Sequence, residues 1–442
     1  MKRLVLSLIL VIIISVGLCS CGKPKDGVDL WNRIDKAMDS LDSYTTEANA
    51  TISVDMDGVV INGTTEGETL IVGAQKGDLS VYQFTSTEIN APNVTQTASQ
   101  IVAYDNGNMY LFNMEGQASR KLYSKMSEEE FWDYYIRDNS DVDLNPENCG
   151  KVSFGQMDDD GWTLKISEFT KDKVKEIADH LGFNSATFGV NVEDIRIEIV
   201  ADKKYRVNEM RFELVSSENK TVLTATISYK DFDSTTPKEF DKSSYLEVED
   251  VRPIANITND MNKALSRDVG SFELVLSHRR ISLQSGSNSQ IYKETDKISY
   301  AVKDGKYTYD IYADADSNIE MSYADGVQKI IINNRQTQTN KQTDTEARAL
   351  VASLMNNAGY DPINVISVKV LEDGVYELRC SVNDATDYRN IMESLGDAYK
   401  DYLLVFTATF DENGELAKLE SNLTITGAWY EYIVNTKLEI NK

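Results

Sequence analysis

Histidine and cysteine are scarce in this chain, and the few present are not spaced for metal or redox chemistry. Two histidines, His180 and His278, and four cysteines occur among 442 residues. Neither histidine has a second ligand at metal-binding spacing, and no Cys-x-x-Cys pair follows Cys21. Phosphate loops, nucleophile elbows and His-Glu-x-x-His motifs are also missing. We therefore expect no enzyme, catalytic residue, metal or cofactor, and we expect both histidines on the surface.

Positive charge is also in short supply. Lysine and arginine total 45 against 71 acidic residues, which gives a net charge of -26. Such a surface repels nucleic-acid phosphates and lacks the basic patches that bind anionic lipid. Acidic runs at Asp141 and Asp314 lack the glycine that a calcium loop needs. Carboxylate pairs for glycoside cleavage stay open, because such partners need not be close in sequence.

Long hydrophobic runs are limited to one, from Leu4 to Leu18. It is short for a membrane helix, which needs ~20 apolar residues. The basic Lys2 and Arg3 precede it, and a polar segment begins at Gly22. This order is typical of a signal peptide.

The end of that run, Leu18-Cys19-Ser20-Cys21, resembles the lipobox of bacterial lipoproteins. The resemblance implies a signal peptide over residues 1–20, cleavage before Cys21, and lipid on the Cys21 thiol. Residues 21–27 would form the tether, and two or more acyl chains would hold the protein stably on a membrane. The protein would face outward from the cell membrane, or lie in the periplasm or outer membrane of a two-membrane cell. An ordinary cleaved signal and an uncleaved N-terminal anchor are the alternatives.

Three blocks of sequence recur in the same order, which indicates two tandem units. We place the units at 28–248 and 253–442. The remaining cysteines, Cys149 and Cys380, fall in different units, so we favour buried hydrophobic roles over a disulfide. The blocks pair residues 34–44 with 261–272, residues 160–182 with 373–396, and residues 197–214 with 406–423.

Each unit begins with an amphipathic helical pattern and continues with alternating, strand-like segments. Capping boxes at Ser127–Glu130 and Thr343–Glu346 predict a further helix in each unit. Helices added to a long antiparallel meander predict an α+β fold. The apolar stripes of the two first helices consist of Trp31, Ile34, Met38 and Leu41, and of Ile257, Met261 and Leu265.

The helix segment Asp35-Lys36-Ala37-Met38 with Ser43-Tyr44, behind a lipobox, resembles the LolA/LppX-like superfamily of bacterial lipoproteins and lipid carriers. The resemblance implies, once per unit, a strongly curved antiparallel sheet that forms an incomplete β-barrel. Helices would cover its open face, and an apolar cavity would hold acyl chains. The two apolar stripes then become the candidate cavity-lining residues.

Two functional hypotheses follow. In the first, the protein is a surface-anchored binding module for lipid or another apolar ligand. In the second, it is a non-catalytic envelope interaction or scaffold protein with filled cores. An apolar cavity of ~300 Å³ or more beneath the helices would favour the first hypothesis.

Overall fold

The fold is described from a computed structural model of the whole chain. The structure describes residues 23–441 apart from short gaps. The gaps are 57–58, 76, 92–93, 117, 140–145, 147–148, 159–160, 181–191, 217–219, 267–269, 284–289, 304–305, 315–317, 356–359, 382–385 and 395.

The chain divides into two compact units between Glu247 and Val248. The joint predicted from sequence, residues 249–253, lies just beyond this division. Independent folding of the two units stays a prediction.

Unit 1 consists of long strands with three described helices between them. The helices are α1 (Gly27–Asp39), α2 (Glu128–Asn139) and α3 (Lys171–His180). The strands are β1 (Ser43–Met56), β2 (Val59–Val72), β3 (Ser80–Ala91), β4 (Val94–Asp105), β5 (Asn108–Glu115), β6 (Ala118–Lys125), β7 (Cys149–Gln156), β8 (Trp162–Phe169), β9 (Val192–Ala201), β10 (Val207–Ser216), β11 (Thr221–Lys230) and β12 (Leu246–Glu247).

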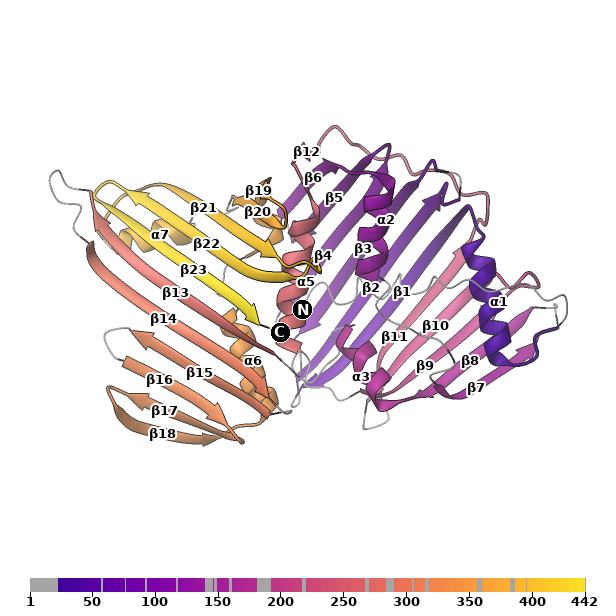
Figure 1. Cartoon of the computed structure of the whole chain (residues 1–442), viewed down its shortest axis with the longest axis horizontal. Coiled ribbons are helices and arrows are strands. Elements are labelled where there is room, and N and C mark those ends of the chain that lie inside the picture. The colour runs from indigo at the N-terminus through magenta and orange to yellow at the C-terminus, as the bar shows by residue number, and fades with distance from the viewer. Residues whose placement is uncertain are drawn as a thin grey trace. The chain divides into compact units, whose positions relative to one another are not determined.

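These strands form a 12-stranded sheet in the order β12-β6-β5-β4-β3-β2-β1-β11-β10-β9-β8-β7 (Figure 1). Every neighbouring pair is antiparallel except β12 with β6. The first strand pairs with the last hairpin through the β1–β11 ladder, in which Ala48 lies opposite Ile227. This pairing joins the meander β1–β6 to the meander β7–β11 in one sheet.

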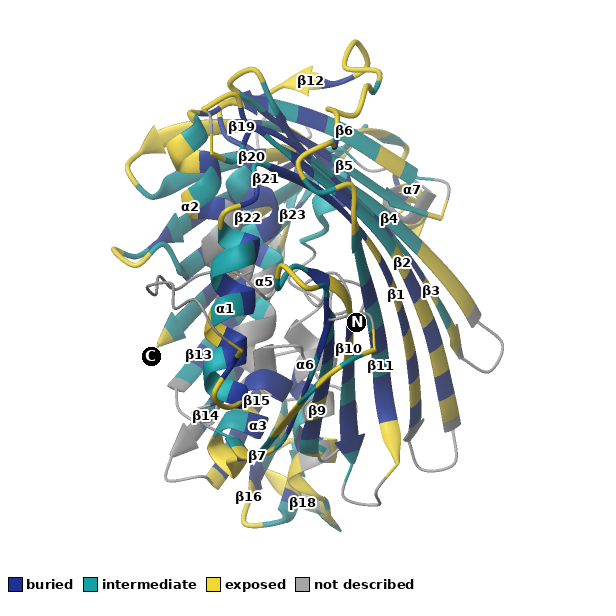
Figure 2. Cartoon of the chain, turned by 90° about the vertical axis from the view of Figure 1, so that its right-hand side faces the viewer, coloured by how far each residue is buried: buried dark blue, intermediate teal, exposed yellow. Residues whose placement is uncertain are grey.

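Burial alternates along the central strands because successive side chains point to opposite faces. On β1, Ala48, Ala50 and Ile52 are buried, while Glu47 and Thr51 are exposed. Figure 2 shows the same alternating bands on β2 and β3. One face of the sheet therefore forms the core of unit 1.

Unit 2 repeats this plan with slightly fewer strands. Its α-helices are α5 (Arg252–Ser266), α6 (Asp344–Met355) and α7 (Thr386–Ser394), and a short 3-10 helix, η4, spans Pro362–Asn364. Its strands are β13 (Gly270–Ser282), β14 (Gln290–Lys303), β15 (Lys306–Asp314), β16 (Asn318–Ala324), β17 (Val327–Ile332), β18 (Arg335–Lys341), β19 (Val365–Glu372), β20 (Val375–Cys380), β21 (Tyr399–Phe410), β22 (Leu416–Gly427) and β23 (Tyr430–Asn441).

The 11-stranded sheet of unit 2 has the order β18-β17-β16-β15-β14-β13-β23-β22-β21-β20-β19. If β12 is left out, the strands of the two sheets follow the same order, in which β1 corresponds to β13 and β11 corresponds to β23. Both predicted capping boxes are present ahead of α2 and α6. The Glu130 carboxylate accepts from Ser127 N–H at 2.8 Å, and Glu346 accepts from Thr343 N–H at 2.7 Å.

The predicted α+β class is wrong. Strands make up 63% of the structure and helices 16%, and the two sheets are large and open rather than incomplete barrels closed by helices. No layer of helices covers a face of either sheet in the described part of the chain. The reason is one of size, because a 13-residue helix such as α1 is only ~20 Å long. Twelve strands at ~4.8 Å spacing extend over roughly 50 Å.

Within the described ranges, no helix is both long and apolar enough to cross a membrane.

Candidate ligand-binding site beneath helix α1

Helix α1 is fixed at its N-terminal end by its own cap and by contacts with unit 1. The side chain of Asp26 accepts from the N–H of Asp29 at 2.8 Å and so caps the helix. Arg33 then joins Asp29 at 3.1 Å and donates to the hydroxyl of Tyr205 at 3.1 Å. Because Tyr205 lies in the β9–β10 turn, these contacts hold α1 against that hairpin.

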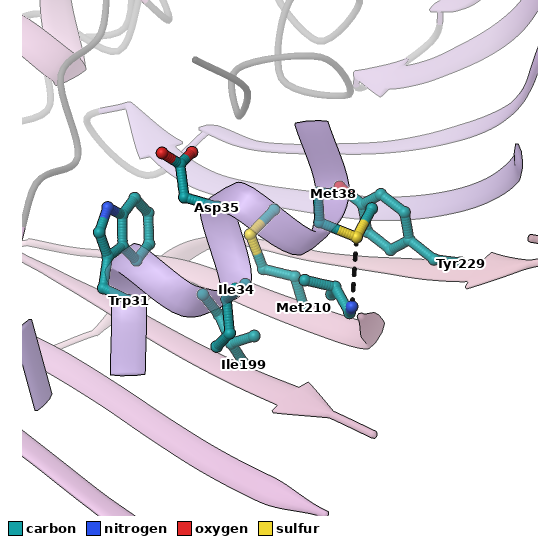
Figure 3. A pocket seen from close by; sticks show the side chains of 8 residues that line it. Trp31, Ile34, Asp35, Met38, Ile199, Met210 and Tyr229 are labelled. Atoms are coloured by element: carbon teal, nitrogen blue, oxygen red, sulfur yellow. Dashed lines mark hydrogen bonds between the residues drawn. The ribbon is translucent and has the colours of Figure 1, made fainter. Parts of the chain in front are cut away.

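The apolar stripe of α1 faces β9, β10 and β11 and encloses a small cavity with them (Figure 3). In Figure 3, Ile34 lies beside Ile199, and Met38 lies beside Tyr229. The cavity has a volume of about 20 Å³, which is room for about one water molecule. Its lining consists of Trp31, Ile34, Asp35, Met38, Ile199, Val207, Met210 and Tyr229.

Two polar groups near the C-terminal end of α1 have weak or no partners among the described residues. The backbone N–H of Val207 donates to the sulfur of Met38 at 3.3 Å, and a thioether is a weak acceptor. The Oδ1 atom of Asp39 is buried and has no hydrogen-bond partner among the described residues. Burial, reinforced by the nearby charge of Asp35, raises the pKa of Asp39 to about 6. At this end of α1, apolar packing therefore contributes more to the contact with the sheet than hydrogen bonds do, whereas the Arg33–Tyr205 hydrogen bond joins the earlier part of the helix to the hairpin.

The structure brings together three of the four residues in the first predicted stripe. Trp31, Ile34 and Met38 line the cavity, whereas Leu41 is buried but does not line it. The sheet residues opposite them were not among the predicted cavity-lining residues. Ile199, Val207 and Met210 fall within the predicted hairpin over residues 197–214, and Tyr229 lies outside it. The alternation of apolar residues in a hairpin does not reveal which helix packs on its strands.

In unit 2 the corresponding stripe lies on α5. Ile257 is fully buried and Met261 is half-buried. The side chain of Leu265 lies outside the described residues, as do the lipobox residues Leu18, Cys19, Ser20 and Cys21.

The remaining candidates from the sequence are placed as follows. His278 is half-buried on β13, and its Nδ1 lies 2.8 Å from the hydroxyl of Tyr432. The side chain of His180 lies outside the described residues. Cys380 is buried and Cys149 is half-buried, in separate units. Over the described ranges, no cluster of three or more His, Cys, Asp or Glu residues could hold a metal ion.

Comparisons with known proteins give weak structural likeness only. No protein-family model and no curated protein matches the chain. The lipoprotein LppX of Mycobacterium tuberculosis is 10% identical, and the match covers 50% of this chain and all of LppX with a TM-score of 0.28. A DUF1329 family protein from Desulfovibrio piger is 12% identical over 49% of this chain and 97% of its own, with a TM-score of 0.19. Membership of the LolA/LppX-like superfamily therefore stays a prediction.

Proposed function

We propose that this protein is an exported, lipid-anchored binding module that takes up an apolar ligand beneath α1 and acts without catalysis. The observation that carries the proposal is the apolar lining of the cavity between α1 and β9–β11. One carboxylate, Asp35, is present among lining side chains that are otherwise apolar or aromatic. Such a surface suits a hydrocarbon chain, which gains from leaving water and needs few polar partners.

The cavity volume limits how this uptake occurs. At about 20 Å³ the space is far below the ~300 Å³ of an open ligand site. Helix α1 must therefore move away before a ligand enters, and the ligand would replace contacts that α1 now makes. At the Met38 end of α1, the weak Val207–Met38 hydrogen bond and the Asp39 oxygen, which has no partner among the described residues, favour this movement. The Arg33–Tyr205 hydrogen bond of 3.1 Å would break if the whole helix left.

The cavity is far smaller than the ~300 Å³ expected beneath the helices of a carrier, so its volume favours the second hypothesis, a scaffold that binds no ligand. Leu30, Ile34 and Met38 are each at most 5% exposed. In a scaffold this packing would be permanent, and the outer surfaces of the protein would meet an envelope partner. The two proposals differ in whether hydrocarbon ever reaches Trp31.

The test uses Trp31 as a reporter, since its indole lines the cavity. The full-length protein is purified from bacteria, its bound lipid is analysed by mass spectrometry after solvent extraction, and the lipid-free protein is titrated with 9,10-dibromostearic acid. We expect extractable lipid and quenching of tryptophan fluorescence, because bromine quenches only at close range.

Trp31→Phe should abolish most of this quenching, whereas the matched variant Trp429→Phe should retain it. Trp429 lies in unit 2 and is 53% exposed. Wild-type protein with no extractable lipid and no quenching would count against the binding module and for the scaffold.

A further inference from the structure

The chain meets the folded part of unit 1 very soon after the proposed lipid attachment site. Pro24 is already buried, three residues after Cys21. The Lys23 ammonium donates to the side-chain oxygen of Gln156, at the end of β7, at 2.8 Å. The three steps from Cys21 to Pro24 span at most about 11 Å. A lipid on Cys21 would therefore hold this end of β7 close to the membrane surface.

From there the N-terminal segment follows the edge strand β7 to the start of α1 (Figure 1). Lys23 contacts Gln156, and the backbone of Gly27 packs against the side chain of Val152. Phe154 lies between these two contacts on the same face of β7, because alternate residues of a strand share a face. Its side chain is 39% exposed. An exposed aromatic ring thus lies beside the segment that would join the protein to its lipid.

The core face of unit 1 ends at this ring. Phe154 lies opposite Leu164 of β8, which is fully buried, and β7 is the last strand of the sheet. A single exposed apolar residue needs no partner by itself. The position of Phe154 gives it meaning, because Phe154 is only two residues, ~7 Å along the strand, from Gln156 and the tether.

The charges next to this edge are balanced, unlike those of the whole chain. The register of β7, β8 and β9 places the β7–β8 and β9–β10 connections at the same end of the sheet. The first connection, residues 157–161, contains three aspartates, and the second, residues 202–206, contains three basic residues and one aspartate. Lys23 supplies the remaining positive charge. Anionic lipids repel a chain of net charge -26, so a neutral edge is the part that approaches a bilayer most easily.

We propose that the β7 edge of unit 1 lies on the membrane surface, with the Phe154 ring inserted among the lipid headgroups. This inference rests on the proposed function, because it needs lipid on Cys21, and it adds the orientation of unit 1. The occupant is a bilayer rather than a protein, because a tether of about 11 Å is no longer than the width of one helix. Phenylalanine suits this position, since its ring can enter the boundary between headgroups and acyl chains.

Site-specific photo-crosslinking tests this orientation in cell membranes. The photoreactive residue p-benzoylphenylalanine replaces Phe154 in the full-length chain, the membranes are irradiated, and the purified protein is analysed by intact-mass measurement. We expect an added mass of one phospholipid on a chain that also carries acyl groups at Cys21. The replaced ring is exposed, so the larger side chain should be accommodated without unfolding.

The matched control places the same photoreactive residue at Val60, which is 47% exposed. Val60 pairs with Asp55 near the end of β1, whereas the row of Gln156 crosses the sheet to the start of β1 near Thr45. The two positions are therefore at opposite ends of the same sheet. We expect no phospholipid adduct at Val60.

Phe154→Trp and Val60→Trp give a second readout. In vesicles of dibrominated phosphatidylcholine, the added tryptophan should be quenched at position 154 and not at position 60. On a chain with acylated Cys21, phospholipid adducts at neither position, or equally at both, would overturn the orientation and leave the anchor standing. A protein-sized adduct at position 154 would show that a partner covers β7 instead. A chain without lipid at Cys21 would remove both the anchor and this inference.

Discussion

At the scale of single residues, two aspartates of α1 have opposite electrostatic surroundings. Asp29 lies in the first turn, where the Arg33 guanidinium and the N–H of Lys25 hold its pKa below the usual range. Asp39 lies at the last position of the helix, where burial and the charge of Asp35 raise its pKa to about 6. An ionised carboxylate at this position also faces the negative end of the helix dipole. Asp39 therefore opposes the closed position of α1 once it is ionised.

We predict that Asp39→Asn stabilises the protein at neutral pH. A raised pKa means that the folded state holds the Asp39 proton more tightly than the unfolded state does. The resulting stability is present below pH 3.8 and is lost as the pH rises through about 6. The Tm of the variant should thus exceed that of the wild type at pH 7.5, and the difference should vanish near pH 4. Differential scanning calorimetry across this range measures both values.

Asp29→Asn is the control with the opposite sign, because its lowered pKa makes ionisation stabilising. Its Tm at pH 7.5 should fall below that of the wild type. A Tm difference for Asp39→Asn that is independent of pH would contradict the assignment.

At the scale of elements, α1 is placed by a close approach to the edge strand β7. A Cβ added to Gly27 would lie 2.3 Å from Cγ1 of Val152, which is closer than real atoms come. The first residue of the helix therefore has to be glycine for α1 to sit at this height above the strand. The same approach sets the depth at which Trp31 and Ile34 reach the cavity.

Gly27→Ala should accordingly destabilise unit 1 by about 1–3 kcal/mol, the usual cost of overpacking. Urea unfolding measures the loss. Adding Val152→Ala should restore part of it, because the clashing methyl group is removed. Gly155→Ala on β7 is the matched control, since its Cβ would meet only Thr163 at an ordinary 3.5 Å. A double variant no more stable than Gly27→Ala alone would mean that the clash does not position the helix.

At the scale of the whole molecule, the proposed function depends on attachment to a membrane. The lipobox-like segment ends at Cys21, and the first described helix begins at Gly27. The six residues from Cys21 to Asp26 extend at most about 20 Å, which would keep α1 near the lipid surface from which a ligand comes.

We predict that Cys21→Ser leaves the protein without lipid and moves it out of the membrane fraction. Cys19→Ser should retain both lipid and membrane attachment, because a small residue suits that position of a lipobox. Intact-mass measurement of the native protein should show acyl chains at an N-terminal Cys21. A mature chain that begins elsewhere and carries no lipid mass would contradict the prediction.

What the sequence determined by itself is local. Both capping boxes, the alternation of the strands and the hairpin of β9 and β10 could be read from neighbouring residues, because each depends on contacts a few positions apart. The fold class was predicted wrongly because helical patterns are easily recognised in the sequence. The width of a sheet depends on how many strands pair, which the sequence does not show.

Only the tertiary structure decided what lies opposite each face. Periodicity shows that Met38 and Ile199 are both inward, but not that they meet beneath α1. It likewise shows threonines on neighbouring strands, but only the strand register places Thr46 directly opposite Thr69. The physical reason is that local periodicity fixes the direction of a side chain, whereas its partner is set by pairings between residues distant in the chain.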